Sequence, residues 1–233
     1  ATHTSGLAYT FSIKGDLQEI YLQEKIFPYY AIDTLSDDVK PEKIYKDICA
    51  FSKKVATVPL AHQPGDAWTY SIGMDILGCV IEKASDMSFG NFLKKIIFEP
   101  LQMEDTFFKV PVAKRSRMTN LYAHHNAFKA FDVDIPKELK GKKPKMYLID
   151  SSRDSLFYKS ITVEDGGSGL VSTASDYSNF AQMLLNKGVY EGKRILSAAS
   201  FNTLISNQLN EKNSRFRGFG MGITLGIALD SKK

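Results

Sequence analysis

Two runs of apolar residues at helical spacing constrain the fold more than any other feature of the chain. The first run lies between residues 72 and 84, after a turn at 62–66, and the second lies between 89 and 97. Ser88 is a residue type that begins helices, and Pro100 must end the second helix. The spacing predicts two consecutive helices, each with one apolar face turned to the core. Their expected core residues are Ile72, Ile76, Leu77, Val80, Ile81 and Ala84 in the first helix, and Phe89, Phe92, Leu93, Ile96 and Ile97 in the second.

Further helix signals lie on both sides of this pair. Apolar residues at helical spacing predict a helix within 40–55, and the segment from 110 to 158 has no such period and predicts long loops with a hairpin. The C-terminal third predicts two more helices, one that begins near Thr173 or Ser175 and stops at Gly188, and one that begins at Ser197.

Strict alternation marks the segment 219–229. Bulky apolar residues take every odd position, and glycine, threonine or alanine takes every even one. A period of two predicts one long strand, which needs partner strands for its backbone hydrogen bonds. The residues alone therefore indicate a largely helical domain with one strand.

The composition is that of a globular protein, with 43% apolar and 24% charged residues among 233. Cys49 and Cys79 are far apart and lack metal-type spacing, so the sequence predicts neither a disulfide nor a zinc site. It contains no run of about 18 apolar residues, and so predicts no membrane span. No signal peptide is recognisable.

The net charge of +4 is mild, and its densest part is a lysine cluster within 137–145 that also contains Gly141 and Pro144. This cluster predicts a solvated loop, with a weak contact to an anionic surface as the alternative. Binding to nucleic acid is not predicted, because such proteins carry denser basic patches.

Several kinds of catalytic chemistry have no motif here. We find no glycine-rich phosphate loop and no metal-ligand cluster, so we predict neither a cofactor nor a metal. Hydrolysis without a metal needs a nucleophile and a base. Neither a Gly-x-Ser-x-Gly elbow nor a Ser-x-x-Lys motif occurs in residues 1–233.

A set of short segments follows one another in order along nearly the whole chain. They are Thr2–Leu7, His62–Gly65, Trp68–Ser71, Asp75–Glu82, Phe98–Leu101 with Met103, Asp105–Thr106, Gly166–Ser172, Asp176–Tyr177 and Phe180–Ala181. Together they resemble the serine β-lactamase-related superfamily, most strongly its branch of class C-like β-lactamases, family VIII carboxylesterases and penicillin-binding proteins. The resemblance implies a β-lactamase/transpeptidase-like α+β fold, with residues 1–217 as mainly helical subdomain and loops and 218–230 as one strand of its antiparallel sheet.

By this resemblance Tyr70 is the catalytic base. A free phenol has a pKa of about 10, so a tyrosine base needs cationic neighbours. The lysine of a Ser-x-x-Lys motif would supply that charge, and the phenolate would take the serine proton, pass it to the leaving group and later activate water. The alternative is an ordinary half-buried tyrosine before a helix.

Three further residues are predicted to line the substrate site. Ile72 stands where β-lactamases of this branch keep an asparagine, which favours ester hydrolysis over β-lactam hydrolysis. Gly167 and Ser168 fall where the family places a loop of the substrate cleft, and a structural turn before a helix is the equal alternative. The histidines His3, His62, His124 and His125 are interpreted as structural, and Trp68 as packing.

These residues predict a serine hydrolase that forms an acyl-enzyme on a small ester or amide, most like a carboxylesterase. The alternatives are a penicillin-binding D-peptidase or β-lactamase, and a non-catalytic relative that binds a partner. The resemblance places the Ser-x-x-Lys segment before Ala1 and a third motif after Lys233, so we expect the chain to be an internal fragment of one domain. Neither compartment nor oligomeric state is assigned.

Overall fold

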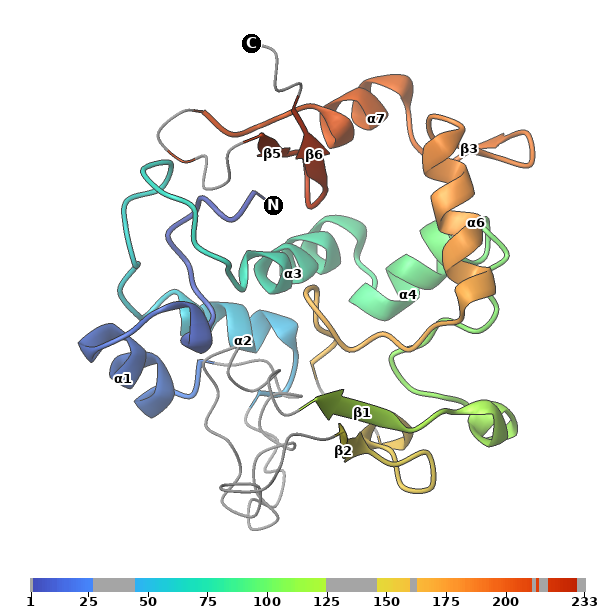
Figure 1. The fold of residues 1–233 in the computed structure, drawn as a ribbon, viewed down its shortest axis with the longest axis horizontal. Helices are drawn as coiled ribbons and strands as arrows, with labels where there is room; N and C mark the ends of the chain where they lie inside the picture. The colour runs from blue at the N-terminus through green and yellow to red at the C-terminus, as the bar shows by residue number, and fades with distance from the viewer. Residues whose placement is uncertain are drawn as a thin grey trace.

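The computed structural model describes residues 2–26, 45–124, 146–159, 163–210, 213 and 218–229. Helices and short antiparallel strand pairs make up this part of the chain, as expected for an α+β protein (Figure 1). The helices are η1 (Thr10–Ser12), α1 (Asp16–Gln23), α2 (Ile48–Val55), α3 (Gly73–Ser85), α4 (Phe89–Leu93), η3 (Lys94–Phe98), η4 (Val112–Arg117), η6 (Leu156–Tyr158), α6 (Ala174–Leu185) and α7 (Ala198–Ile205). The strands are β1 (Leu121–His124), β2 (Met146–Asp150), β3 (Val189–Tyr190), β4 (Lys193–Arg194), β5 (Phe219–Met221) and β6 (Gly226–Ala228).

Helix α3 runs through the middle of the molecule and packs against both α2 and α4 (Figure 1). The helix predicted within 40–55 is shorter in the structure. Within the described residues it begins at Ile48, because the side chain of Asp47 accepts a hydrogen bond from the backbone nitrogen of Ala50 and caps it there. Residues 27–44, and with them the lower part of the prediction, lie outside the described residues.

The apolar stripe predicted for α3 is only partly buried. Ile72 is fully buried just before the helix, whereas Leu77 and Val80 are 37% and 54% exposed. The residues of α3 that are buried are Asp75 and Gly78. The helix therefore turns a polar side chain inward and leaves part of its apolar face on the surface, which the apolar period alone does not predict.

The second predicted helix forms but changes its winding midway, and Ile96, which was expected in the core, is 40% exposed. The side chain of Ser88 accepts a hydrogen bond from the nitrogen of Asn91 and caps α4. The helix then continues as the π-helical turn η3, where the nitrogen of Glu99 donates to the carbonyl of Lys94 five residues earlier. It ends near Pro100, which confirms the predicted boundary.

The two predicted C-terminal helices are confirmed. Thr173 caps α6 through its side-chain oxygen, and Ser197 caps α7 in the same way. Gly188 has φ +88° and its nitrogen donates to the carbonyl of Met183, so it ends α6 in a left-handed conformation that glycine adopts without strain.

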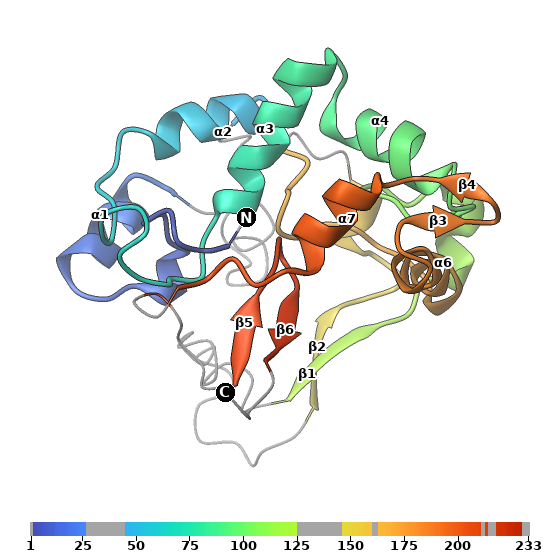
Figure 2. The same cartoon turned by 90° about the horizontal axis from the view of Figure 1, so that it is seen from above.

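Strands occur as three hairpin-like pairs among the described residues. Strands β1 and β2 pair antiparallel, which confirms the hairpin predicted within 110–158. The single long strand predicted at 219–229 is wrong: β5 and β6 pair with each other, with Met221 opposite Gly226. Thr224 takes φ +66° in the turn between them, so the segment folds back on itself and supplies its own partner strand (Figure 2).

Two apolar cores hold these elements. The first joins the N-terminal segment, α1, α2 and the start of α3, and includes Tyr21, Phe51, Val55 and Ile72. The second lies between η3 and α6 and includes Phe98, Leu101, Met103, Met183 and Tyr190. Burial of such side chains contributes roughly 1.5–3 kcal/mol each. A third, smaller cluster consists of Ile48, Cys49 and Val163.

A disulfide joins Cys49 of α2 to Cys79 of α3. The sequence analysis predicted no disulfide, and that prediction is wrong. Spacing along the chain could not reveal the bond, because the two cysteines meet only when α2 and α3 pack side by side, which places their Cα atoms 4.9 Å apart.

Candidate functional site

The segment that carries Tyr70 is held by the first residues of the described chain. The backbone nitrogen of Tyr9 donates to the carbonyl of Tyr70 at 3.2 Å, and the nitrogen of Thr69 donates to the carbonyl of His3 at 2.9 Å. Figures 1 and 2 both show the N-terminus beside the first turn of α3. The backbone of Tyr70 is therefore fixed on the side that faces the N-terminal segment.

The ring of Tyr70 lies among aromatic rings and is still 42% exposed. The ring centroids of His3 and Tyr9 lie 4.7 Å and 5.1 Å from its own, and those of Phe11 and Trp68 lie at 6.1 Å and 6.3 Å. None of these four rings carries a permanent positive charge. In the part of the chain that the structure describes, these rings surround a partly exposed phenol and do not supply the cation that a tyrosine base requires.

His3 and His62 have structural partners, as predicted. The Nδ1 atom of His3 accepts from the backbone nitrogen of Ser71 at 3.1 Å and lies 3.1 Å from its hydroxyl oxygen. Burial lowers the pKa of His3, which favours the neutral ring that can accept this bond. The ring nitrogens of His62 lie 2.9 Å from the carbonyl of Gln63 and 3.1 Å from the Thr69 hydroxyl. His124 lies on β1, and His125 is outside the described residues.

Gly167 and Ser168 lie in an exposed loop that packs against the start of α3. A Cβ atom on Gly166 would collide with the carbonyl of Met74, and one on Gly167 would collide with the hydroxyl of Tyr9. Glycine is therefore favoured at both positions, because neighbouring parts of the chain approach too closely to leave room for a side chain. Because Tyr9 also contacts the Tyr70 ring, this loop lies one side chain away from Tyr70.

Ile72 is placed differently from Gly167 and Ser168. Its side chain is 0% exposed and belongs to the first core. An apolar side chain at this position is buried with its neighbours, so the structure shows a packing role for Ile72 and no exposed surface for a substrate contact.

The sequence analysis missed Asp75, which joins the parts of this site. Asp75 is 0% exposed. Its Oδ1 accepts from the nitrogen of Gly167 at 3.0 Å, and its Oδ2 accepts from the hydroxyl of Tyr9 at 3.3 Å. Burial raises the pKa of Asp75, and the N–H groups of Gly167 and Gly166 and the hydroxyl of Tyr9 act in the opposite direction. An acidic residue inside an apolar helical stripe is the signal that would have found it.

A second buried carboxylate, Asp165, directly precedes the loop. It is 2% exposed, its Oδ2 accepts from the hydroxyl of Ser168 at 3.0 Å, and its Oδ1 has no hydrogen-bond partner among the described residues. Burial raises its pKa to about 7, with the charge of Asp75 as the second cause. Burial also raises the pKa of Tyr9, and the charge of Asp75 adds to this effect.

A third buried carboxylate, Asp176, fastens two distant segments together. Its Oδ2 accepts from the backbone nitrogen of Asp105 at 2.8 Å and from the hydroxyl of Thr106 at 2.7 Å. Next to these bonds, Phe107 and Val171 form an isolated antiparallel bridge. The Asp105–Thr106 and Asp176–Tyr177 segments, which the sequence analysis noted separately, thus meet in space and hold the loop before α6.

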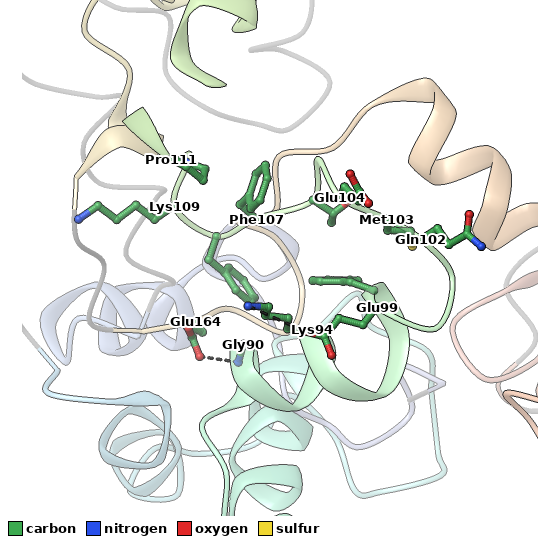
Figure 3. Close-up of a pocket in the computed structure, with 13 residues that line it drawn as sticks. Gly90, Lys94, Glu99, Gln102, Met103, Glu104, Phe107, Lys109, Pro111 and Glu164 are labelled. Carbon is green, nitrogen blue, oxygen red and sulfur yellow. Dashed lines mark hydrogen bonds and ion pairs between the residues drawn. The ribbon is translucent and has the colours of Figure 1, made fainter. Parts of the chain in front are cut away.

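A cavity of about 730 Å³ borders α4 and η3. Its walls come from α4, η3, the segment 102–111 and Glu164, whose carboxylate accepts from the nitrogen of Gly90 at 2.6 Å (Figure 3). Burial raises the pKa of Glu164. The lining includes neither Tyr70 nor the loop at 166–169, so this cavity is separate from the Tyr70 site.

Within the ranges given above, no three histidine, cysteine or acidic side chains are grouped so that they could hold a metal ion. No helix in the same ranges has the length and apolar character needed to cross a membrane.

Comparison with known sequences finds one family model and several relatives. The model described as "Beta-lactamase" matches residues 1–227. Protein Rv1367c of Mycobacterium tuberculosis is 29% identical over 241 residues, which cover 100% of this chain and 51% of that protein. Esterase EstB of Burkholderia gladioli is 30% identical over 107 residues, which cover 46% of this chain and 24% of the esterase. The chain thus spans about half the length of the first of these relatives.

Solved structures show the same fold. EstCE1, a hydrolase with promiscuous acyltransferase activity, superposes with a TM-score of 0.62 at 18% identity, covering 99% of this chain and 55% of that one. Simvastatin synthase LovD from Aspergillus terreus superposes with a TM-score of 0.63 at 18% identity, covering 98% of this chain and 52% of that one. These likenesses show the fold, and the chain corresponds to about half of each structure.

Proposed function

The chain belongs to the beta-lactamase family, and from this premise we propose that it is the mainly helical part of a serine hydrolase that works through an acyl-enzyme on a small ester or amide. Residues 1–217 form that helical part, and 218–230 contribute to the sheet of the same domain. Members of this fold family include esterases, acyltransferases and penicillin-binding proteins.

The proposal rests on Tyr70, which the resemblance assigns as the base and which is 42% exposed among aromatic rings that frame it. The rings of His3 and Tyr9 pack against the phenol ring, and a group that transfers protons works best when it is held in place. In the proposed reaction the Tyr70 phenolate takes the proton of the attacking serine and passes it to the leaving group. It then removes a proton from the water that cleaves the acyl-enzyme.

The nucleophile must come from outside residues 1–233, because they contain no Ser-x-x-Lys motif. The lysine of that motif would also provide the positive charge that the rings around Tyr70 do not. The proposed substrate cleft is bordered by the exposed loop at Gly167 and Ser168, which Tyr9 connects to Tyr70. No cofactor or metal is part of the proposal.

Ester substrates are favoured by Ile72, which is buried where the β-lactamases carry an amide side chain. Similarity to esterase EstB and to the lovastatin esterase of Penicillium rubens agrees with this choice. A penicillin-binding D-peptidase is the second candidate, because penicillin-binding protein 4* of Bacillus subtilis is 30% identical over 141 residues, which cover 54% of this chain and 30% of that protein.

The test uses the full polypeptide that carries this chain. A fluorophosphonate probe should label it at one serine, and a short-chain nitrophenyl ester should turn over faster than a chromogenic cephalosporin. Folded protein that stays unlabelled would point to a non-catalytic relative that binds a partner. Trapping by labelled penicillin without ester turnover would support the peptidase.

A further inference from the structure

Within the described residues, the side chain of Asp75 bonds both to the loop at 166–169 and to Tyr9, which lies beside Tyr70. Through Oδ1 it holds the backbone of Gly167, and through Oδ2 it accepts from Tyr9, whose ring lies 5.1 Å from that of Tyr70. Tyr9 also donates its backbone N–H to the carbonyl of Tyr70. Removal of Asp75 would therefore release the loop and the aromatic frame together.

We infer that Asp75 positions Tyr70 and the loop at 166–169, and that it does so as a pair with Asp165 in which the two carboxylates hold one proton. The inference rests on the proposed function for its catalytic consequence, although the proton-holding pair can be tested without catalysis.

The contacts of the two carboxylates argue for a single negative charge. Asp75 accepts two hydrogen bonds with its two oxygens, as an ionised carboxylate does. Asp165 is 2% exposed and receives only the Ser168 hydroxyl, while its Oδ1 has no partner among the described residues. A second buried negative charge without a partner would raise the free energy of the folded state. Asp165 is therefore the carboxyl that keeps the proton.

The charged and titratable groups around the pair agree with this assignment. Tyr9, in the N-terminal segment, donates a hydrogen bond from its hydroxyl to Asp75, and the ring of Tyr70 lies 5.1 Å from that of Tyr9. Ser168 and the N–H groups of Gly166 and Gly167 face the pair from the loop, while Glu164 is bonded to Gly90. None of these groups is a cation, so among the described residues the proton itself is what limits the charge.

The sign of the resulting pH dependence follows from Asp165. Burial, and then the charge of Asp75, raise its pKa to about 7, above the ordinary carboxyl value. The stability that its protonated form contributes is fully present below about pH 4 and is lost as the pH rises through about 7. Ionisation of Asp165 should then loosen the loop and the frame around Tyr70.

The first experiment compares thermal unfolding of the full polypeptide with that of Asp165→Asn, which makes the residue permanently neutral. The melting temperature of the variant should exceed that of wild type by more at pH 8 than at pH 5, and the excess should grow by on the order of 5 °C between the two pH values. Asp154→Asn, at an exposed site, should follow wild type at both pH values. A difference between Asp165→Asn and wild type that is equal at pH 5 and pH 8 overturns the pair, whether or not the protein is a hydrolase.

The second experiment measures ester hydrolysis against pH. Asp75→Asn keeps an oxygen for Gly167 but loses the acceptor for Tyr9, and Asp75→Ala loses both. We expect kcat/KM to fall by about 10-fold in the first and about 100-fold in the second. Asp165→Asn should keep its rate above pH 7, where the wild-type rate declines.

An active wild type with an unchanged rate and pH profile in Asp75→Asn overturns the positioning role. Wild type without ester turnover or probe labelling instead contradicts the proposed function, and the melting comparison still decides on the pair.

Discussion

Cys49 and Cys79 form a disulfide that fastens α2 to α3, the helix that begins three residues after Tyr70. The bond closes a loop of 30 residues, and Cys49 packs beside Ile48 and Val163 in a small core of its own. A disulfide stabilises a fold mainly by lowering the conformational entropy of the unfolded chain.

Removal of the disulfide should lower the free energy of unfolding by about 3 kcal/mol. Chemical unfolding of wild type with and without reductant measures this loss directly. The double variant Cys49→Ala/Cys79→Ala should resemble reduced wild type and should not respond to reductant. Equal stability of oxidised and reduced wild type would contradict the prediction.

Gly166→Ala should be strongly destabilising, by about 3 kcal/mol, since its Cβ would collide with the backbone carbonyl of Met74. The matched control is Gly226→Ala, where an added Cβ meets nothing within 4 Å. Thermal unfolding of both variants gives the comparison, and equal effects at the two glycines would rule out close packing as the reason for Gly166.

Asp176→Asn should cost about 2 kcal/mol of stability, because two hydrogen bonds to a charged acceptor are weakened in a buried place. A double-mutant cycle with Thr106→Val isolates the bond to the threonine hydroxyl. Ser178→Ala, at an exposed position on α6, serves as the control and should change stability little. Additive effects of the two substitutions would show that the bond contributes nothing.

Tyr70→Phe should reduce kcat for ester hydrolysis by about 100- to 10,000-fold and leave the melting temperature nearly unchanged, because only an exposed hydroxyl is removed. Tyr177→Phe, which alters a tyrosine that is 65% exposed on α6, should retain full activity. Steady-state kinetics of both variants test the assignment, and full activity of Tyr70→Phe would remove Tyr70 from the mechanism.

Local signals in the sequence predicted α2, α3, α4, α6 and α7, whereas α1 was not predicted, because the apolar residues around it are irregularly spaced. Ser88, Thr173, Ser197 and Gly188 act where their chemistry suggested, because caps and stops depend on hydrogen bonds to residues three to five positions away. The hairpin of β1 and β2 was also expected. The family resemblance, carried by several motifs in order, is confirmed by the match over residues 1–227.

Features that depend on distant contacts were not predictable in the same way. The residues at 219–229 alternate both before and after the turn, so one long strand and a hairpin give the same pattern. The alternation therefore did not reveal the chain reversal at Thr224. The disulfide depends on how α2 packs against α3. Asp75 and Asp165 lie 90 positions apart in sequence, and only the folded chain shows that both are buried beside the same loop.

The hydrogen bonds between residues 3–9 and 61–70 have a consequence for the order of folding. They join segments about 60 positions apart, so forming them costs the conformational entropy of closing a long loop. We expect the amides of Thr69 and Tyr9 to gain protection from hydrogen exchange late in refolding, after those of α3. The surroundings of Tyr70 would then be among the last parts of this chain to reach their native arrangement.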